Sequence, residues 1–389
     1  MKILVVGGMF PPMRTGTAFY TRNLALALQS HGHQVEVVTL GNVGTDIEDG
    51  LTVHRLAAIS LPLAGFFKHY RLCAWSPANW WRLYRIARCS GAEAILLVNH
   101  YLDIAFPARF AAWLNGIPLV CSVGTQLQSL NPRRNRILNF LDRLVCGLLV
   151  FPGCTRIVAW DTQIRQYLQD VQGKGILRKV VIVNYGVNGD PDHLLSRQHD
   201  YEEDDVILGV GAVSEQRSFV PLVQAFAQLA PKYPRLRLRI AGHIYYDAAP
   251  GLAAELGLAD RVEFMGEMPH EQVIDQMQRA TLFYSSLTGK YVGLGTATIE
   301  AMLLGLPTVV NTPLELLGTG VLVDRQHLIQ STSGDPTEIA ARLELLLTDI
   351  DLRRRVGEGG RMFVKQHLNW DVVAQQMANV LQQAAEKTR

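Results

Sequence analysis

The chain has 389 residues, of which 48% are hydrophobic and 19% are charged, and its formal net charge is +2. A net charge this close to zero excludes the overall basic character of nucleic-acid-binding proteins. At roughly 100–200 residues per domain, the length predicts two or three domains.

The first half of the chain alternates strand and helix patterns. Residues 2–7 predict a buried parallel strand, a loop follows at 8–17, and the helical spacing of Tyr20, Leu24 and Leu28 predicts a helix that ends at Gly32. A second strand at 34–40 completes a right-handed βαβ unit. Further strands are predicted at 93–99, 118–123, 156–160 and 180–184. Residues 1–190 are therefore predicted to form a doubly wound α/β domain.

A polar, turn-rich stretch at 191–204 predicts a linker, after which the α/β pattern starts again. The predicted strands are 206–212, 236–242, 262–266, 281–285 and 307–310, and the predicted helices are 219–230, 270–279, 296–304 and about 370–386. Residues 205–369 are thus predicted to form a second doubly wound domain. Two such domains in series bind ligands where the carboxyl ends of their strands face each other across a cleft.

The cysteines and the apolar segments bear on the compartment. Five cysteines at spacings that fit no metal site indicate a reduced, cytoplasmic environment. The start of the chain reads as a strand and not as a secretory signal. The longest apolar stretch, 144–151, is far shorter than the ~20 residues that cross a bilayer. We expect a soluble protein, or one that lies on a membrane surface.

Three loops carry candidate binding residues. Gly16 follows the first strand and would let the backbone at a helix start approach a phosphate, although the same loop fits a tight turn before a helix. Arg217 stands between a strand and a helix, where it suits a diphosphate or is a solvated surface arginine. Glu300 lies in the first turns of a helix after Gly293 and Gly295, as a partner of ribose hydroxyls or of the helix dipole. A nicotinamide role is disfavoured because Ser214 replaces the last glycine of the dinucleotide pattern.

Taken together, these segments resemble a known family. Four segments occur in the order found in the retaining GT-B glycosyltransferases of family four. They are FPPMRTGTAFYTRN (10–23), VILGVGAVSEQRSFVPLVQAF (206–226), GLADRVEFMGEMPHEQVIDQM (257–277) and GLGTATIEAMLLGLPTVV (293–310). NWDVVAQQM (369–377) resembles the family's final helix, which crosses back to the first domain. The resemblance therefore implies that residues 370–389 complete the N-terminal, acceptor-side domain, and that 205–369 bind the donor.

The resemblance implies a UDP-sugar or GDP-sugar donor, no further cofactor, no obligatory metal, and retention at the anomeric carbon. It implies a sugar, lipid-linked or small-molecule acceptor. Catalytic roles carry over to Arg217, at the diphosphate in place of the usual lysine, and to Glu300, at the ribose hydroxyls. The remaining donor-binding positions that it implies are Thr15, Gly16, Met268, Gly293, Gly295 and Thr296.

Three positions depart from the family pattern. Val292 replaces the first glutamate of the Glu-x7-Glu motif, Ala212 replaces a phosphate-binding arginine, and Gly124 replaces a histidine. Lys290 and His100 are expected to supply a replacement cation and a replacement histidine, and Gly124 and Thr125 mark the acceptor side. The departures leave open a non-catalytic nucleotide-sugar binder that is the partner of an active transferase. A nucleotide-sugar epimerase on the same architecture is a third reading.

Two stretches of the first domain mix basic and apolar residues. Residues 66–88 contain Trp75, Trp80 and Trp81 with several arginines, and 131–145 place Arg133, Arg134 and Arg136 before an apolar helix. Such composition suits the interface of an anionic membrane, so we expect peripheral contact at the inner face of the cytoplasmic membrane. The alternative is that the tryptophans belong to the core.

Overall fold

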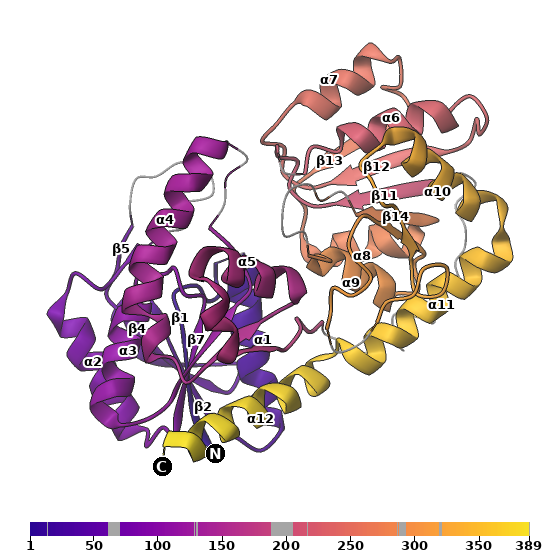
Figure 1. The fold of residues 1–389 in the computed structure, drawn as a ribbon. Helices are drawn as coiled ribbons and strands as arrows, with labels where there is room; N and C mark the ends of the chain where they lie inside the picture. Colours follow the sequence, from indigo (N-terminus) through magenta and orange to yellow (C-terminus); the bar gives the residue numbers. More distant parts are fainter. Residues whose placement is uncertain are drawn as a thin grey trace. The chain divides into compact units, whose positions relative to one another are not determined.

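The computed structural model in Figure 1 describes residues 1–13, 15–60, 71–127, 129, 131–187, 205–215, 217–285, 287, 293–318 and 321–388. The chain divides into two units: unit 1 holds Met1–Gly186 and Trp370–Arg389, and unit 2 holds Val187–Asn369. The domain division predicted from the sequence groups residues 1–190 with 370–389 in one domain and puts residues 205–369 in the other. The predicted linker, 191–204, lies outside the described residues.

Unit 1 is built on one sheet with the strand order β10-β9-β8-β7-β1-β2-β4-β3. Every neighbouring pair is parallel except β3 and β4, which form an antiparallel edge that the sequence reading had missed. A separate antiparallel pair joins β5 (Ile59–Ser60) and β6 (Arg71–Leu72). The strands of the main sheet are β1 (Lys2–Gly7), β2 (Gln34–Leu40), β3 (Gly44–Glu48), β4 (Leu51–Leu56), β7 (Ala94–Val98), β8 (Leu119–Val123), β9 (Arg156–Ala159) and β10 (Val180–Ile182).

Helices from both ends of the chain cover unit 1. The core on one face of the sheet joins residues of β1 and β7 to α1 and α12, so the last helix belongs to the first unit. Buried Tyr20 of α1 lies against Trp370, at the start of α12, with ring centroids 5.7 Å apart. The helices are α1 (Gly16–Ser30), α2 (Pro77–Cys89), α3 (Ala105–Asn115), α4 (Pro132–Leu149), η2 (Phe151–Gly153), α5 (Thr162–Gln172), η3 (Lys174–Arg178) and α12 (Trp370–Thr388).

Unit 2 has a single parallel sheet with the strand order β13-β12-β11-β14-β15-β16. The strands are β11 (Val206–Val210), β12 (Arg237–Ala241), β13 (Val262–Gly266), β14 (Leu282–Ser285), β15 (Thr308–Val310) and β16 (Ile329–Gln330). The helices are α6 (Val220–Leu229), α7 (Ala248–Glu255), α8 (His270–Arg279), α9 (Thr296–Leu303), α10 (Pro336–Thr348) and α11 (Ile350–His367).

Both faces of the unit 2 sheet are buried. Ile207 and Leu282 pack with α6, α7 and α10 on one face, whereas Leu208 and Phe283 pack with α8 and α9 on the other. Burial on both faces explains why these strands read as continuous apolar runs. The prediction of two doubly wound α/β halves is confirmed for the two units.

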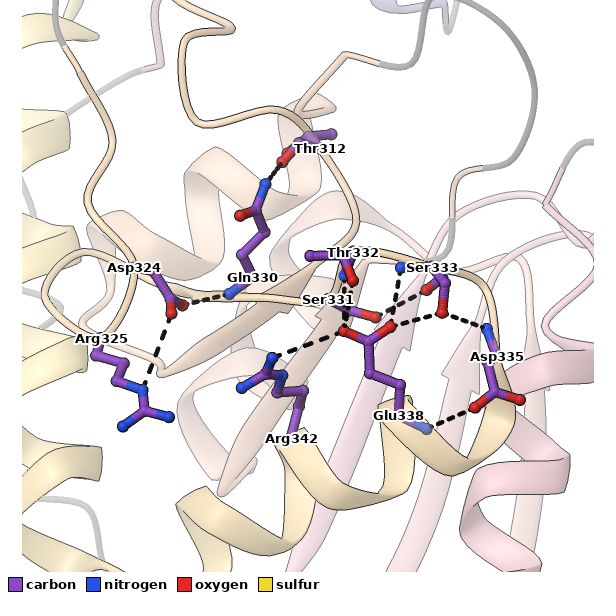
Figure 2. A network of polar contacts seen from close by, with 10 residues as sticks. All are labelled: Thr312, Asp324, Arg325, Gln330, Ser331, Thr332, Ser333, Asp335, Glu338 and Arg342. Carbon is purple, nitrogen blue, oxygen red and sulfur yellow. Dashed lines mark hydrogen bonds and ion pairs between the residues drawn. The ribbon is translucent and has the colours of Figure 1, made fainter.

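A polar network fixes the start of α10, as Figure 2 shows. Asp335 is the N-cap, and its Oδ2 accepts from the backbone N–H of Glu338 at 3.0 Å. Glu338 reaches back, and its carboxylate accepts from the backbone and hydroxyl groups of Thr332 and Ser333 at 2.6–3.0 Å. These hydrogen bonds hold the pKa of Glu338 at about 2. The network therefore stabilises both the helix terminus and the loop before it.

Glu338→Ala should lower the free energy of unfolding by about 1–2 kcal/mol at pH 7. This is less than the pKa shift alone would give, because the side chain is 20% exposed and solvent screens its interactions. The folded pKa of Glu338 lies below its ordinary value. Its contribution is therefore present above about pH 4.5 and is lost as the pH falls toward 2. Urea unfolding of both proteins between pH 7 and pH 3 should show the difference shrinking. Glu358→Ala, at an exposed position of α11, is the control; an equal loss there would contradict the assignment.

No helix among the described residues is both long enough and apolar enough to cross a membrane.

Candidate functional site

The predicted donor-binding residues of unit 2 follow the carboxyl ends of its parallel strands. Arg217 lies after β11, and Met268 lies after β13. Gly293 and Gly295 lie between β14 and α9, and Thr296 is the first residue of α9. Because all strands of this sheet are parallel, their carboxyl ends meet at one edge. The fold of unit 2 thus brings these residues to the edge where doubly wound sheets bind ligands.

Arg217 is the cation at this edge. Its backbone exchanges hydrogen bonds with Ser214 at 3.0 and 3.1 Å, which closes a tight loop. The loop folds the guanidinium onto Gly211, where any Cβ would collide with it. Burial lowers the pKa of Arg217, and among the described residues no carboxylate pairs with it. A largely buried cation without a partner is a characteristic of anion sites.

The start of α9 supplies hydrogen-bond donors. Its N-cap is Gly295, which has φ of 77° and no side chain that could cap the helix. The N–H groups of the first turn, beginning at Thr296, therefore lack an intrahelical acceptor and carry the positive end of the helix dipole. Gly293 and Gly295 are partly exposed on either side of buried Leu294. Together, these features form a backbone surface suited to phosphate oxygens.

Glu300 has a partner that sequence reasoning missed. Its Oε1 lies 2.9 Å from Nε2 of His270, the first residue of α8. The hydrogen bond that the His270 ring donates to the Glu300 carboxylate outweighs burial and raises the pKa of His270. Partly exposed Met268 lies two residues before His270, in the same loop. The histidine thus orients the carboxylate that the resemblance assigns to the ribose.

Glu300→Gln should lower the pKa of His270, because the neutral amide no longer stabilises the imidazolium. An NMR titration of the His270 ring resonance measures this change. Glu271→Gln is the matched control, since Glu271 is only a minor cause of the shift and its loss should move the pKa less. If both variants move it equally, the carboxylate of Glu300 is not the main partner.

Two of the predicted positions, Lys290 and Val292, lie outside the described residues. Ala212 is described: it follows β11, and its backbone nitrogen packs beside Gly242. Alanine brings no charge to position 212, and Arg217 is the basic residue of the segment 211–219.

In unit 1, Thr15 and Gly16 form the start of α1. Thr15 is the N-cap, and its Oγ1 accepts from the N–H of Ala18 at 3.2 Å. A Cβ at Gly16 would meet no atom within 4 Å, so the backbone there is open on that side. The hydroxyl of Thr15 is therefore engaged in capping, whereas Gly16 leaves room for a ligand.

Gly124 lies beneath the indole of Trp160. A Cβ at position 124 would overlap three ring carbons of Trp160. The backbone N–H of Gly124 donates to Asn99 Oδ1 at 3.2 Å, and the neighbouring Thr125 hydroxyl is hydrogen-bonded to Tyr101 at 2.8 Å. The indole of Trp160 therefore fills the space that any side chain at position 124 would need.

His100 is fully buried. Its Nε2 lies 3.2 Å from Asp142 Oδ1, its ring stacks on Phe151, and Tyr167 donates to the other oxygen of Asp142 at 2.5 Å. Burial acts to raise the pKa of Asp142, but the charge and hydrogen bond of His100 together with Tyr167 lower it. The expectation that His100 replaces an acceptor-side histidine is wrong for this structure, because its side chain has no exposed surface.

His100, Asp142 and Cys146 also present potential metal-ligand atoms within 4.8 Å of one another. Asp142 and Cys146 are four residues apart on α4, whereas His100 joins them only through the packing of that helix, which cysteine spacing does not reveal. All five cysteines are free thiols, and burial chiefly raises the pKa of Cys146.

The tryptophans of the predicted surface stretch separate into two kinds. Trp75 and Trp81 are 60% and 56% exposed, whereas Trp80 is partly buried and packs edge-on against Phe110. A core role is therefore wrong for Trp75 and Trp81. Residues 66–70 of this stretch lie outside the described residues.

Two family models match the chain. "Glycosyltransferase Family 4" matches residues 14–190, and "Glycosyl transferases group 1" matches residues 194–363. Mannosylfructose-phosphate synthase of Agrobacterium fabrum is 28% identical over 191 residues, which are 44% of this chain and 41% of that protein. The chain thus spans less than half of that relative's length in the match.

Two solved structures share the fold over the whole chain. Sucrose-phosphate synthase of Thermosynechococcus elongatus superposes with a TM-score of 0.73 at 18% identity and covers 100% of both chains. HepE of Anabaena, solved with UDP and glucose, has a TM-score of 0.71 at 15% identity and covers 98% of this chain and 99% of its own. With two family models matched in sequence and a GT-B fold, this chain belongs to glycosyltransferase family 4, the glycosyl transferases group 1.

Proposed function

We propose that this chain is a retaining glycosyltransferase that moves a sugar from a UDP-sugar or GDP-sugar to an acceptor without a metal or other cofactor. Family membership supports transfer from a nucleotide sugar. The UDP bound in HepE, a structural relative, favours a uridine nucleotide. A non-catalytic nucleotide-sugar binder is not favoured, because both family models that match the chain describe glycosyltransferases.

The observation that carries this proposal is Arg217. Its guanidinium is held over Gly211 by the Ser214 loop, is largely buried, and pairs with no carboxylate among the described residues. A diphosphate would supply the missing negative charge. The uncapped start of α9 at Gly295 lies at the same sheet edge and would donate N–H groups to the phosphate oxygens.

Retention would follow from substitution on one face of the sugar. The bond from the anomeric carbon to the diphosphate oxygen breaks, the acceptor oxygen bonds to the same face, and the acceptor proton passes to the leaving diphosphate. Arg217 and the first N–H groups of α9 would stabilise the charge that grows on the diphosphate. Glu300, oriented by His270, would accept the ribose hydroxyls.

The remaining assignments complete the proposal. Gly16 leaves room for donor phosphates, and Thr15 holds that helix start in place. Gly124 and Thr125 are assigned to the acceptor side, together with the indole of Trp160 that replaces the family's histidine. The acceptor is a sugar, a lipid-linked molecule or a small molecule. We place the protein at the inner face of the cytoplasmic membrane, in peripheral contact with anionic lipid.

Nucleotide binding tests the proposal directly. UDP, GDP, ADP and their sugars are added to the protein in EDTA, and the unfolding temperature and binding heat are recorded. At a hundred times its dissociation constant, a true ligand stabilises the fold by about 2.7 kcal/mol. If no nucleoside diphosphate has an effect at millimolar concentration, the donor site does not exist.

Stereochemistry is tested separately. The nucleotide sugar that binds is incubated with the protein, and proton NMR follows the anomer of the first sugar released or transferred. Retention predicts that the product keeps the donor's configuration. A product of opposite configuration contradicts the proposed mechanism while leaving the donor site intact.

A further inference from the structure

The outer face of α4 is apolar, which is unusual for a helix at a protein surface. Phe140 is 63% exposed, Leu148 is 62% exposed and Ile137 is 59% exposed. In Figure 1 the outer half of α4 stands clear of the other labelled elements of unit 1. The exposed apolar residues recur at helical spacing and so form one stripe: Ile137, Phe140, Leu141, Leu144, Leu148 and Leu149.

The inner face of α4 is held by polar groups. Asp142 is buried and hydrogen-bonded by Tyr167, Cys146 is buried beside it, and η2 and α5 pack against the helix. The helix therefore turns its ionised carboxylate inward and its leucines outward, the reverse of an ordinary surface helix. Because the inner face is already anchored within unit 1, the outer stripe is not an unfinished part of the core.

Four arginines border this stripe. Arg133, Arg134 and Arg136 are exposed in the first turns of α4, and Arg143 is exposed beside Leu144. No acidic residue lies in the first turn, and the carboxylate of α4, Asp142, is buried. Within the described part of the chain, none of the four arginines pairs with an acid. The surface thus combines positive charge with exposed apolar area.

An anionic bilayer interface is the partner that fits this surface. Lipid phosphates complement the arginines, and the acyl boundary accepts the leucines and Phe140. At 1.5 Å per residue, the 18 residues of α4 are about 27 Å long, and the helix carries too many charges to span a membrane. We infer that α4 lies in the plane of an anionic membrane surface with its stripe inserted.

This inference rests on the membrane contact proposed above and not on glycosyl transfer. Flotation on sucrose gradients with vesicles of phosphatidylglycerol and phosphatidylcholine, or of phosphatidylcholine alone, measures it. We expect binding to the anionic vesicles only. Arg133→Gln with Arg134→Gln and Arg136→Gln should weaken binding roughly a hundredfold, since each cation contributes about 1 kcal/mol, which is about fivefold in affinity. Phe140→Gln with Leu144→Gln and Leu148→Gln should weaken it at least tenfold.

A charge-matched control separates this surface from overall charge. Arg165, Lys174 and Arg178 are exposed cations of unit 1 outside α4, and their replacement by Gln should leave binding unchanged. Circular dichroism and the nucleotide-induced rise in unfolding temperature show that each variant is folded. These two measurements also separate a failure of the membrane inference from a failure of the donor site.

Three results would overturn the inference: no flotation with anionic vesicles, equal flotation of wild type and both α4 variants, or loss in the control triple as large as in the arginine triple. Light scattering adds a fourth. If wild-type protein is a dimer and the α4 apolar variant is a monomer with unchanged flotation, the stripe binds a second copy and not lipid.

Discussion

Arg217→Ala is expected to lower the affinity for the nucleoside diphosphate at least about a hundredfold. A hydrogen bond to a charged group is worth about 1.5–3 kcal/mol, and a guanidinium donates two of them to a phosphate. Apo stability should stay the same or rise, because the wild type buries a cation without a carboxylate partner among the described residues. Calorimetric titration and thermal unfolding measure the two effects.

Two further variants make the result specific. Arg217→Lys keeps the positive charge but loses the paired N–H donors of the guanidinium, and should retain part of the affinity for the nucleoside diphosphate. Arg354→Ala removes an exposed cation of unit 2, on α11, and should change neither quantity. Unchanged nucleotide affinity in Arg217→Ala would show that Arg217 is a structural residue, and the proposed donor site would lose its main support.

Gly124→Ala is expected to destabilise the protein by about 2–3 kcal/mol. Its Cβ would overlap the ring of Trp160, which cannot simply rotate away because its Nε1 donates to Ser122 Oγ at 2.9 Å and its ring packs against Tyr20. Denaturant unfolding measures the loss. Gly16→Ala is the matched control, since nothing lies within 4 Å of its Cβ, and it should be neutral or slightly stabilising.

A double mutant identifies the clashing partner. Trp160→Ala removes the ring and has its own cost in lost packing. Adding Gly124→Ala to it should then cost almost nothing, so the two changes should be strongly non-additive. Additive losses would mean that position 124 is constrained by something other than the indole. The same clash predicts that Gly124→His alone cannot restore the family's histidine.

The central strands were predictable from sequence because burial on both faces demands continuous apolar runs. Residues 2–7 and 34–40, which form two inner strands of the unit 1 sheet, were predicted to the residue. The edge strand β3 was not, because GTDIE is exposed along its length and shows no apolar alternation. This strand forms by antiparallel pairing with β4, which its own sequence does not predict.

Candidate site residues could be proposed from the sequence only where a motif carried them. The family pattern pointed to Arg217 and Glu300, and both lie in unit 2 at the predicted elements. The contact of His270 with Glu300 was missed because the two residues are 30 positions apart in the sequence, and no local sequence pattern predicts such a pair. Trp160 was interpreted only as the end of a strand, although its ring leaves no space for a side chain at position 124. His100 was misread because sequence alone does not distinguish a buried histidine from an exposed one.

The return of α12 to unit 1 has a consequence for biosynthesis. Val373, Met377 and Leu381 fill the core beside α1, so this core stays open until residues 370–388 have been synthesised. Unit 2 is continuous from Val187 to Asn369 and needs no later segment. Domains usually fold in the order of synthesis. Here unit 2 can fold first, and unit 1 completes its core only when α12 is available.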